Sequence, residues 1–171
     1  MGIRSFLARP FAAYIANQTR EWSMKPELYQ QRIFNSLIQK GENTFFGKEH
    51  SFESIKTHAD FKKYVPIRDY EALKPYVEKV LHGETDILWK GKPAYFAKTS
   101  GTTSGIKYIP ITQDSIPNHV NSGRNALLNY IHETGNASFA DGDLIFLQGS
   151  PELEKNAGIN TGRLSGIVNH I

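Results

Sequence analysis

Apolar side chains in the first half of the chain recur at helical spacing, and the first predicted helix lies close to the N-terminus. Pro10 lies inside this segment, so we expect the helix to be disturbed there, because proline removes a backbone hydrogen bond. We expect the helix to pack on the rest of the protein rather than on a membrane. Its expected buried side is formed by Phe6, Leu7, Phe11, Tyr14 and Ile15.

A second helix is predicted to begin near Pro26 and to end at Lys40, because proline suits a first helical turn and Gly41 closes the pattern. Asn43–Val65 predicts short helical turns, including a brief helix at residues 60–63 that stops before Pro66. The side chains expected to be buried in these two segments are Leu28, Ile33, Leu37, Ile38, Phe45 and Phe46.

A further helix is predicted from Tyr70 to Leu81. Asp69 is placed to cap its first turn, and Gly83 follows its end, where glycine is common. The residues of this helix that we expect to face inward are Tyr76, Val77 and Val80.

After about residue 91 the pattern changes from helical to extended. Ala94–Ala97 and Tyr108–Thr112 are short runs rich in aromatic or β-branched residues, which predicts two strands on either side of a loop rich in Gly, Ser and Thr. A helix is expected to begin at Asp114 or Ser115 and to reach about His132.

Asp143–Leu147 is an apolar run, and it predicts a fully buried strand. The Gly and Asn residues between Gly149 and Gly162 suggest a mobile loop. Helices over residues 1–90, followed by strand, loop, strand, helix and strand over residues 91–171, predict a mixed α/β fold.

The composition is that of an ordinary soluble globular protein, with 39% hydrophobic and 22% charged residues. The net charge is +3, but basic and acidic residues alternate from Glu49 through Lys92, so nucleic acid is a weakly supported partner. The chain has no cysteine, which excludes disulfides and thiol catalysis and makes the cytoplasm the default location. No stretch approaches the roughly 18 apolar residues of a membrane span.

The loop from Lys98 to Lys107 carries the most informative chemistry. Five hydroxyl residues and two glycines precede Lys107. Glycine permits backbone turns that point several N–H groups at one place, hydroxyls add donors, and lysine supplies a positive charge that suits phosphate. This combination indicates a polyphosphate site, whereas an arbitrary Ser/Gly cluster is usually a flexible hairpin loop.

The loop is not a Walker A motif. That motif needs four residues between its glycines and Lys-Ser/Thr directly after the second, whereas three residues separate Gly101 from Gly105 and Tyr108 follows Lys107. A P-loop kinase or ATPase is therefore disfavoured.

Ser100–Lys107 resembles the first core motif of the adenylate-forming superfamily, from which Ser104 and Ile106 depart. The longer run Phe96–Pro110 looks like bacterial members of the GH3 acyl-acid amido synthetase family, and Phe46–His50 and Val65–Tyr70 are similar to that family too. The resemblance extends from about Trp22 to the end of the chain.

This resemblance implies a large adenylate-forming α/β domain of which the chain is an N-terminal part, and we expect the chain to be truncated and inactive alone. The implied reaction uses ATP and Mg²⁺, the ion being bound mainly by phosphate oxygens rather than by a metal site of the protein. A carboxylic acid is adenylated, and an amine or amino acid then displaces AMP. The implied partners are small molecules, with no nucleic acid and no membrane.

Within the family scheme the loop holds the β- and γ-phosphates of ATP. Lys107 and Thr102 are the implied catalytic residues, because Lys107 offsets the charge of pyrophosphate. The implied phosphate-binding residues are Thr99, Ser100, Gly101, Thr102, Thr103, Ser104, Gly105 and Lys107.

Gln148–Pro151 directly follows the predicted buried strand, and loops at the carboxyl ends of strands commonly line ligand sites. Ser150 is therefore a candidate pocket residue, with a simple turn as the alternative. Two other functions stay open for the chain: a non-catalytic phosphate-binding module, and a basic nucleic-acid-binding domain suggested only by the pI of about 9.0.

Overall fold

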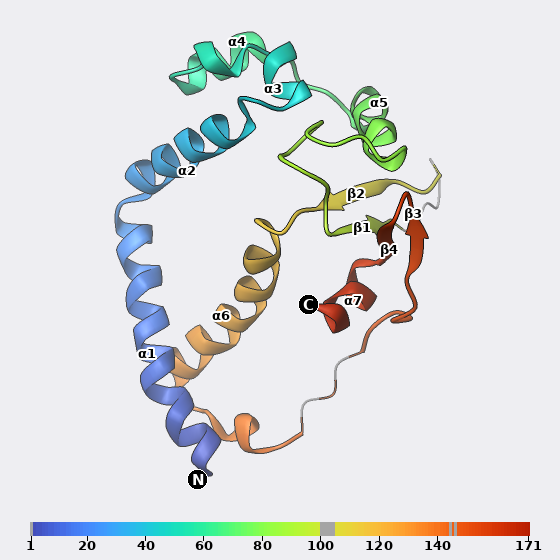
Figure 1. The fold of residues 1–171 in the computed structure, drawn as a ribbon. Helices are drawn as coiled ribbons and strands as arrows, with labels where there is room; N and C mark the ends of the chain where they lie inside the picture. Colours follow the sequence, from blue (N-terminus) through green and yellow to red (C-terminus); the bar gives the residue numbers. More distant parts are fainter. Residues whose placement is uncertain (1, 100–104, 144, 146) are drawn as a thin grey trace. The chain divides into compact units, whose positions relative to one another are not determined.

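The computed structural model describes residues 2–99, 105–143, 145 and 147–171 (Figure 1). The chain divides into two compact units: Met1–Gln30 with Ile116–Leu147, here called the helical unit, and Gln31–Ser115 with Gln148–Ile171, here called the sheet unit. Helices and a four-stranded sheet together make a mixed α/β protein, which confirms the predicted fold class. No helix of the described ranges is both long enough and apolar enough to cross a membrane.

The helical unit is built on two helices, α1 (Ile3–Met24) and α6 (Ile116–Thr134), which pack against each other. The short helix η2 (Ser138–Asp141) and the first turns of α2 (Pro26–Gly41) complete it. The predicted disturbance at Pro10 does not end α1, which continues helically to Met24. The shared core of the unit consists of Ala12, Ile15, Leu128, Ile131 and Ala137.

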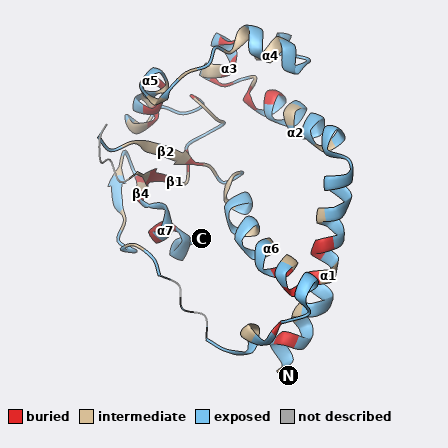
Figure 2. Cartoon of the chain, turned by 180° about the vertical axis from the view of Figure 1, so that it is seen from behind, coloured by how far each residue is buried: buried red, intermediate tan, exposed pale blue. Residues whose placement is uncertain are grey.

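The predicted buried side of α1 is wrong in four of five positions. Ile15 is buried, but Phe6, Leu7, Phe11 and Tyr14 are between 42% and 67% exposed. Figure 2 shows most of α1 in the colour of exposed residues. The helix carries a second apolar stripe made mainly of small residues, and Ala12 and Ala16 belong to it. Because small side chains let two helix backbones approach closely, this stripe forms the contact with α6 and the larger side chains stay outside.

An acidic side chain from η2 caps the start of α1. The Asp141 carboxylate accepts the backbone N–H of Gly2 at 2.6 Å and that of Ser5 at 3.0 Å. Hydrogen bonds from Ser5 and Gly2 hold the pKa of Asp141 below its ordinary value of 3.8. The first turn of α1 is thus satisfied by a residue that is distant in the sequence.

The helices of the sheet unit follow the sequence-based expectation closely. The unit begins within α2 and then contains α3 (Phe45–Glu49), η1 (Phe52–Ser54), α4 (His58–Tyr64) and α5 (Tyr70–Leu81). Asp69 caps α5 by accepting the N–H of Ala72 at 2.9 Å, as predicted.

In α2, Ile38 is buried but the other three expected positions are at least 45% exposed: Leu28, Ile33 and Leu37. Phe45 is also 45% exposed, whereas Phe46 packs against the core.

The sheet contains β1 (Tyr95–Lys98), β2 (Tyr108–Ile111), β3 (Glu154–Asn156) and β4 (Ile159–Arg163), in the order β2-β1-β4-β3. β1 runs antiparallel to β2 and parallel to β4. β1 and β2 match the two predicted strands, and the chain after β4 continues as α7 (Leu164–Ile167) and η3 (Val168–His170).

Two predictions for this part of the chain are wrong: the buried strand at Asp143–Leu147 and the mobile loop between Gly149 and Gly162. Asp143, Ile145 and Leu147 lie outside any strand, with Ile145 87% and Leu147 93% exposed, and the other two members of that run fall outside the described residues. The place beside β1 is taken by β4, from the segment expected to be a mobile loop. β3 and β4 form a tight hairpin because Ala157 and Gly158 both adopt positive φ, the geometry of a two-residue type I′ turn.

The core of the sheet unit lies between α5 and the sheet. It contains the three residues of α5 that were predicted to face inward, Tyr76, Val77 and Val80. Ile87 from the loop before β1, Phe96 of β1 and Ile159 of β4 complete it. Phe96 is fully buried and stacks edge-on with Tyr108 of β2. This core therefore fixes the strands from which the Gly/Ser/Thr-rich loop emerges.

Candidate phosphate-binding site

Two hydrogen bonds close the base of the Gly/Ser/Thr-rich loop. The N–H of Thr99 donates to the carbonyl of Lys107 at 3.0 Å, and the N–H of Lys107 donates to Thr99 Oγ1 at 3.2 Å. Because Lys98 already pairs with Tyr108 in the β1–β2 ladder, these bonds extend the hairpin by one step. The loop therefore leaves the sheet and returns to it at one point.

Only part of the predicted loop can be placed. Ser100, Gly101, Thr102, Thr103 and Ser104 lie outside the described residues. Gly105 is exposed and has a φ of 79°, a conformation that residues with a side chain rarely adopt. The positive φ of Gly105 agrees with the expectation that glycine lets the loop backbone turn.

The Lys107 side chain is positioned by an aromatic ring. Its Nζ lies 5.3 Å from the centre of the Tyr70 ring, at a cation–π distance. The Tyr70 hydroxyl in turn accepts the N–H of Tyr108 at 2.8 Å, so the start of α5 is tied to β2 next to Lys107. Within the described part of the chain, Lys107 has no carboxylate partner, which leaves its charge available to an anion.

Sequence reasoning missed Tyr70, although the residue belongs to one of the segments that carried the family resemblance. Its role depends on the packing of α5 against β2, which no local pattern reveals. The only available signal was its position directly after the Asp69 cap.

A pocket of about 590 Å³ lies beside the loop base, at the carboxyl ends of the parallel strands β1 and β4. Lys98, Ser150 and Arg163 are among the residues that line it. Ser150 is exposed, and its Oγ accepts the N–H of Glu152 at 3.2 Å. The structure thus brings Ser150 close to Lys98 at the end of β1, although not by way of the buried strand that the prediction assumed.

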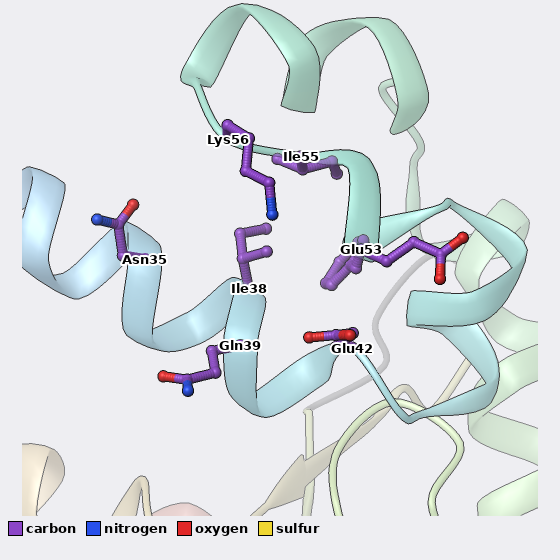
Figure 3. A pocket seen from close by; sticks show the side chains of 8 residues that line it. Asn35, Ile38, Gln39, Glu42, Glu53, Ile55 and Lys56 are labelled. Atoms are coloured by element: carbon purple, nitrogen blue, oxygen red, sulfur yellow. The ribbon is translucent and has the colours of Figure 1, made fainter.

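A second hollow, of about 440 Å³, lies where α2 meets η1 and the segment after it (Figure 3). Its labelled lining combines two amides, two carboxylates and a lysine with two isoleucines: Asn35, Gln39, Glu42, Glu53, Lys56, Ile38 and Ile55. These residues include no hydroxyl or thiol side chain and no glycine-rich backbone that would surround an anion. We therefore place the candidate site at the loop base.

The described features are thus a closed loop base on a mixed four-stranded sheet and a lysine without a carboxylate partner, which make this edge of the α/β fold a candidate phosphate site. Residues 15–170 match the GH3 family N-terminal domain, and the chain belongs to the GH3 family.

Plant proteins of this family are among its relatives. The chain is 24% identical over 98 residues to indole-3-acetic acid-amido synthetase GH3.2 of Arabidopsis thaliana, covering 56% of this chain and 18% of that protein. It is 22% identical over 98 residues to indole-3-acetic acid-amido synthetase GH3.8 of Oryza sativa subsp. indica, covering 56% of this chain and 16% of that protein.

The fold is shared with a solved structure. The AtGH3.15 acyl acid amido synthetase in complex with 2,4-DB superposes on 93% of this chain with a TM-score of 0.78 and 17% sequence identity. The superposed part is 29% of that chain. The chain therefore spans less than a third of the solved relative and about a fifth or less of the two plant synthetases.

Proposed function

We propose that this chain supplies the phosphate-binding part of an ATP-dependent acyl-acid amido synthetase. Its family membership and the activities named for its relatives support the class of reaction. The observation that carries the proposal is the closed loop base with Lys107 beside it. In this reaction a carboxylate attacks the α-phosphorus of ATP, pyrophosphate leaves, and an amine then displaces AMP from the acyl adenylate.

The described residues suit the first of these steps. Thr99 and Lys107 close the loop base, Gly105 allows the backbone to turn, and the Lys107 ammonium faces the growing negative charge of the leaving pyrophosphate. The hydroxyls of Thr102 and its neighbours would donate to the same oxygens. Mg²⁺ bound to the phosphates, with oxygen donors at hand in a hydroxyl-rich loop, would add charge neutralisation.

Lys107→Ala should slow adenylation far more than it affects folding. Charge on the leaving group rises in the transition state, so a cation aimed there stabilises that state more than bound ATP. A hydrogen bond to a charged group contributes about 1.5–3 kcal/mol, which corresponds to a rate loss of about ten- to 150-fold. We expect Lys107→Ala to reach or exceed this range, and Thr102→Ser to be milder than Thr102→Ala because it keeps the hydroxyl.

The measurement is acid-dependent exchange of labelled pyrophosphate into ATP by the full-length protein, together with the melting temperature of each variant. Lys62→Ala is the matched control, since Lys62 is an exposed lysine in the last turn of α4. Near-normal exchange in Lys107→Ala, or a loss of activity that only follows unfolding, would remove the loop from the active site.

A further inference from the structure

A second cation lies at the same edge of the sheet as the phosphate loop. β1 and β4 are parallel, so their carboxyl ends meet, and the register places Arg163 directly opposite Lys98. Side chains paired in this way lie on one face of a sheet. Arg163 is therefore a neighbour of the point where the chain enters the loop at Thr99.

The two cations at this edge differ in their partners. The Lys98 ammonium, 20% exposed, is paired with the carboxylate of Glu154 on β3. Arg163 is exposed, and its side chain makes no hydrogen bond or ion pair with any residue that the structure describes. At the carboxyl ends of β1 and β4, Arg163 thus retains a full charge that the protein itself does not neutralise.

A glycine leaves room for the arginine side chain. A Cβ added to Gly149 would lie 3.2 Å from Arg163 Cδ and 3.1 Å from Ser165 Oγ, both closer than an ordinary contact. Ser165 Oγ accepts the N–H of Gly149 at 3.0 Å, which fixes the two segments together. The aliphatic part of Arg163 therefore runs along the backbone of Gly149.

We propose that Arg163 binds the terminal phosphates of the nucleoside triphosphate, as a second cation at the edge of the sheet where Lys107 lies. This inference rests on the proposed function, since it assumes a polyphosphate at the loop base. A guanidinium is suited to this contact because its planar donors match two phosphate oxygens at once. The ion pair between Lys98 and Glu154 keeps the neighbouring lysine out of the same role, and Gly149 positions Arg163.

The test is calorimetric binding of magnesium pyrophosphate to the full-length protein. Loss of a charge-assisted contact should weaken binding in Arg163→Ala about ten- to a hundredfold. Arg163→Lys, which keeps the charge but not the paired donors, should lose less. Gly149→Ala should weaken binding without removing any charge, because it displaces the arginine. Lys155→Ala on β3 is the control for a general loss of positive charge.

The outcomes separate this inference from the proposed function. If Lys107→Ala weakens pyrophosphate binding and Arg163→Ala does not, the role of Arg163 is overturned while the loop assignment stands. If the wild-type protein does not bind pyrophosphate, both fail. If Arg163→Ala weakens binding of acetate but not of pyrophosphate, the arginine serves a carboxylate and the inference is wrong. Should Arg163→Ala lower the melting temperature markedly, Arg163→Lys and Gly149→Ala decide the question.

Discussion

The two units of this chain bury very different side chains. The helical unit packs α1 on α6 through alanines and a few aliphatic residues, and leaves large side chains such as Phe6 and Leu7 exposed. The sheet unit buries Phe96 completely, packs Tyr108 of β2 edge-on against it, and adds large aromatic and aliphatic side chains of α5 to the same core. The size of a side chain, and not only its hydrophobicity, thus decides which apolar stripe of a helix becomes the core face.

The sheet unit also contains a polar network built on a buried histidine. The ring of buried His50 stacks on Phe46, and its Nε2 lies 2.7 Å from a guanidinium nitrogen of Arg68. Its Nδ1 lies 2.8 Å from the carbonyl of Phe46, so the ring donates from Nδ1 and accepts at Nε2. Arg68 also lies over the rings of Phe46 and Tyr76. Burial, with a hydrogen bond to Glu49, raises the pKa of Tyr76.

The largest difference between the units should appear when an aromatic ring is removed. Phe96→Ala is expected to cost about 3–5 kcal/mol, because it leaves a cavity in a core that cannot fully collapse. Phe6→Ala, at a position 67% exposed, should change stability by at most about 0.5 kcal/mol.

Denaturant unfolding measures both effects. Trp22 lies in the helical unit and Trp89 in the sheet unit. Replacing one of them by phenylalanine leaves the fluorescence of the other to report the unfolding of its own unit. Equal losses in Phe96→Ala and Phe6→Ala would contradict the contrast between the two cores.

Adding volume should be harmful where alanine is buried. Ala12→Leu inserts a larger side chain between α1 and α6 and is expected to destabilise the helical unit by about 1–3 kcal/mol. Asn17→Leu adds the same side chain at an exposed position of α1 and should be nearly neutral. Trp22 fluorescence during unfolding would show the difference, and a harmless Ala12→Leu would mean that the helix contact is loose.

Arg68→Ala should weaken only the sheet unit. It removes the partner of His50 and two cation–π contacts, and we expect a loss of about 1–2 kcal/mol. Arg20→Ala, an exposed arginine of α1, is the control in the helical unit. The readout is the Trp89 unfolding transition, and an unchanged midpoint in Arg68→Ala would show that the network contributes little.

The smallest effects concern acid stability. The folded pKa of Asp141 is lowered, so its contribution is complete above its ordinary value of 3.8 and disappears as the pH falls through the lower folded value. As the pH falls below 3.8, the stability of the wild type should therefore decline more steeply than the stability of Asp141→Asn. In the sheet unit the pKa of Asp60 is also lowered, chiefly by the Thr57 hydroxyl, within one capping box.

These two carboxylates sharpen the comparison. Asp141 joins η2 to the start of α1, whereas Asp60 caps only its own helix. At neutral pH, Asp141→Asn should therefore lower the unfolding midpoint followed by Trp22 fluorescence. This change should be larger than the change that Asp60→Asn causes in the midpoint followed by Trp89 fluorescence. A pH profile of Asp141→Asn that coincides with that of the wild type would refute the capping role.

The sequence predicted those features that depend on neighbouring residues. The Asp69 cap and its helix, strands β1 and β2, and the turn at Gly105 all follow local rules of capping, propensity and backbone freedom. The contact of Tyr70 with Lys107 and the register of Arg163 opposite Lys98 could not be predicted, because they join segments far apart in the chain.

The errors have the same origin. The apolar run at Asp143–Leu147 has the composition of a strand, but the position beside β1 belongs to β4, whose pattern is weaker. Long-range pairing decided between them, as it decided which stripe of α1 became buried. The activity of the loop residues themselves stays a prediction.

The parallel pairing of β1 with β4 also sets an order of events during synthesis. β1 and β2 can form their hairpin as soon as both leave the ribosome, but β4 follows only after α6 has been made. Until then one edge of β1 has no partner, and an unpaired edge invites association with other chains. Pairing between distant strands is also intrinsically slow. We therefore expect a nascent chain paused between Ile111 and Ile159 to associate with other chains more readily than a chain in which β4 is paired.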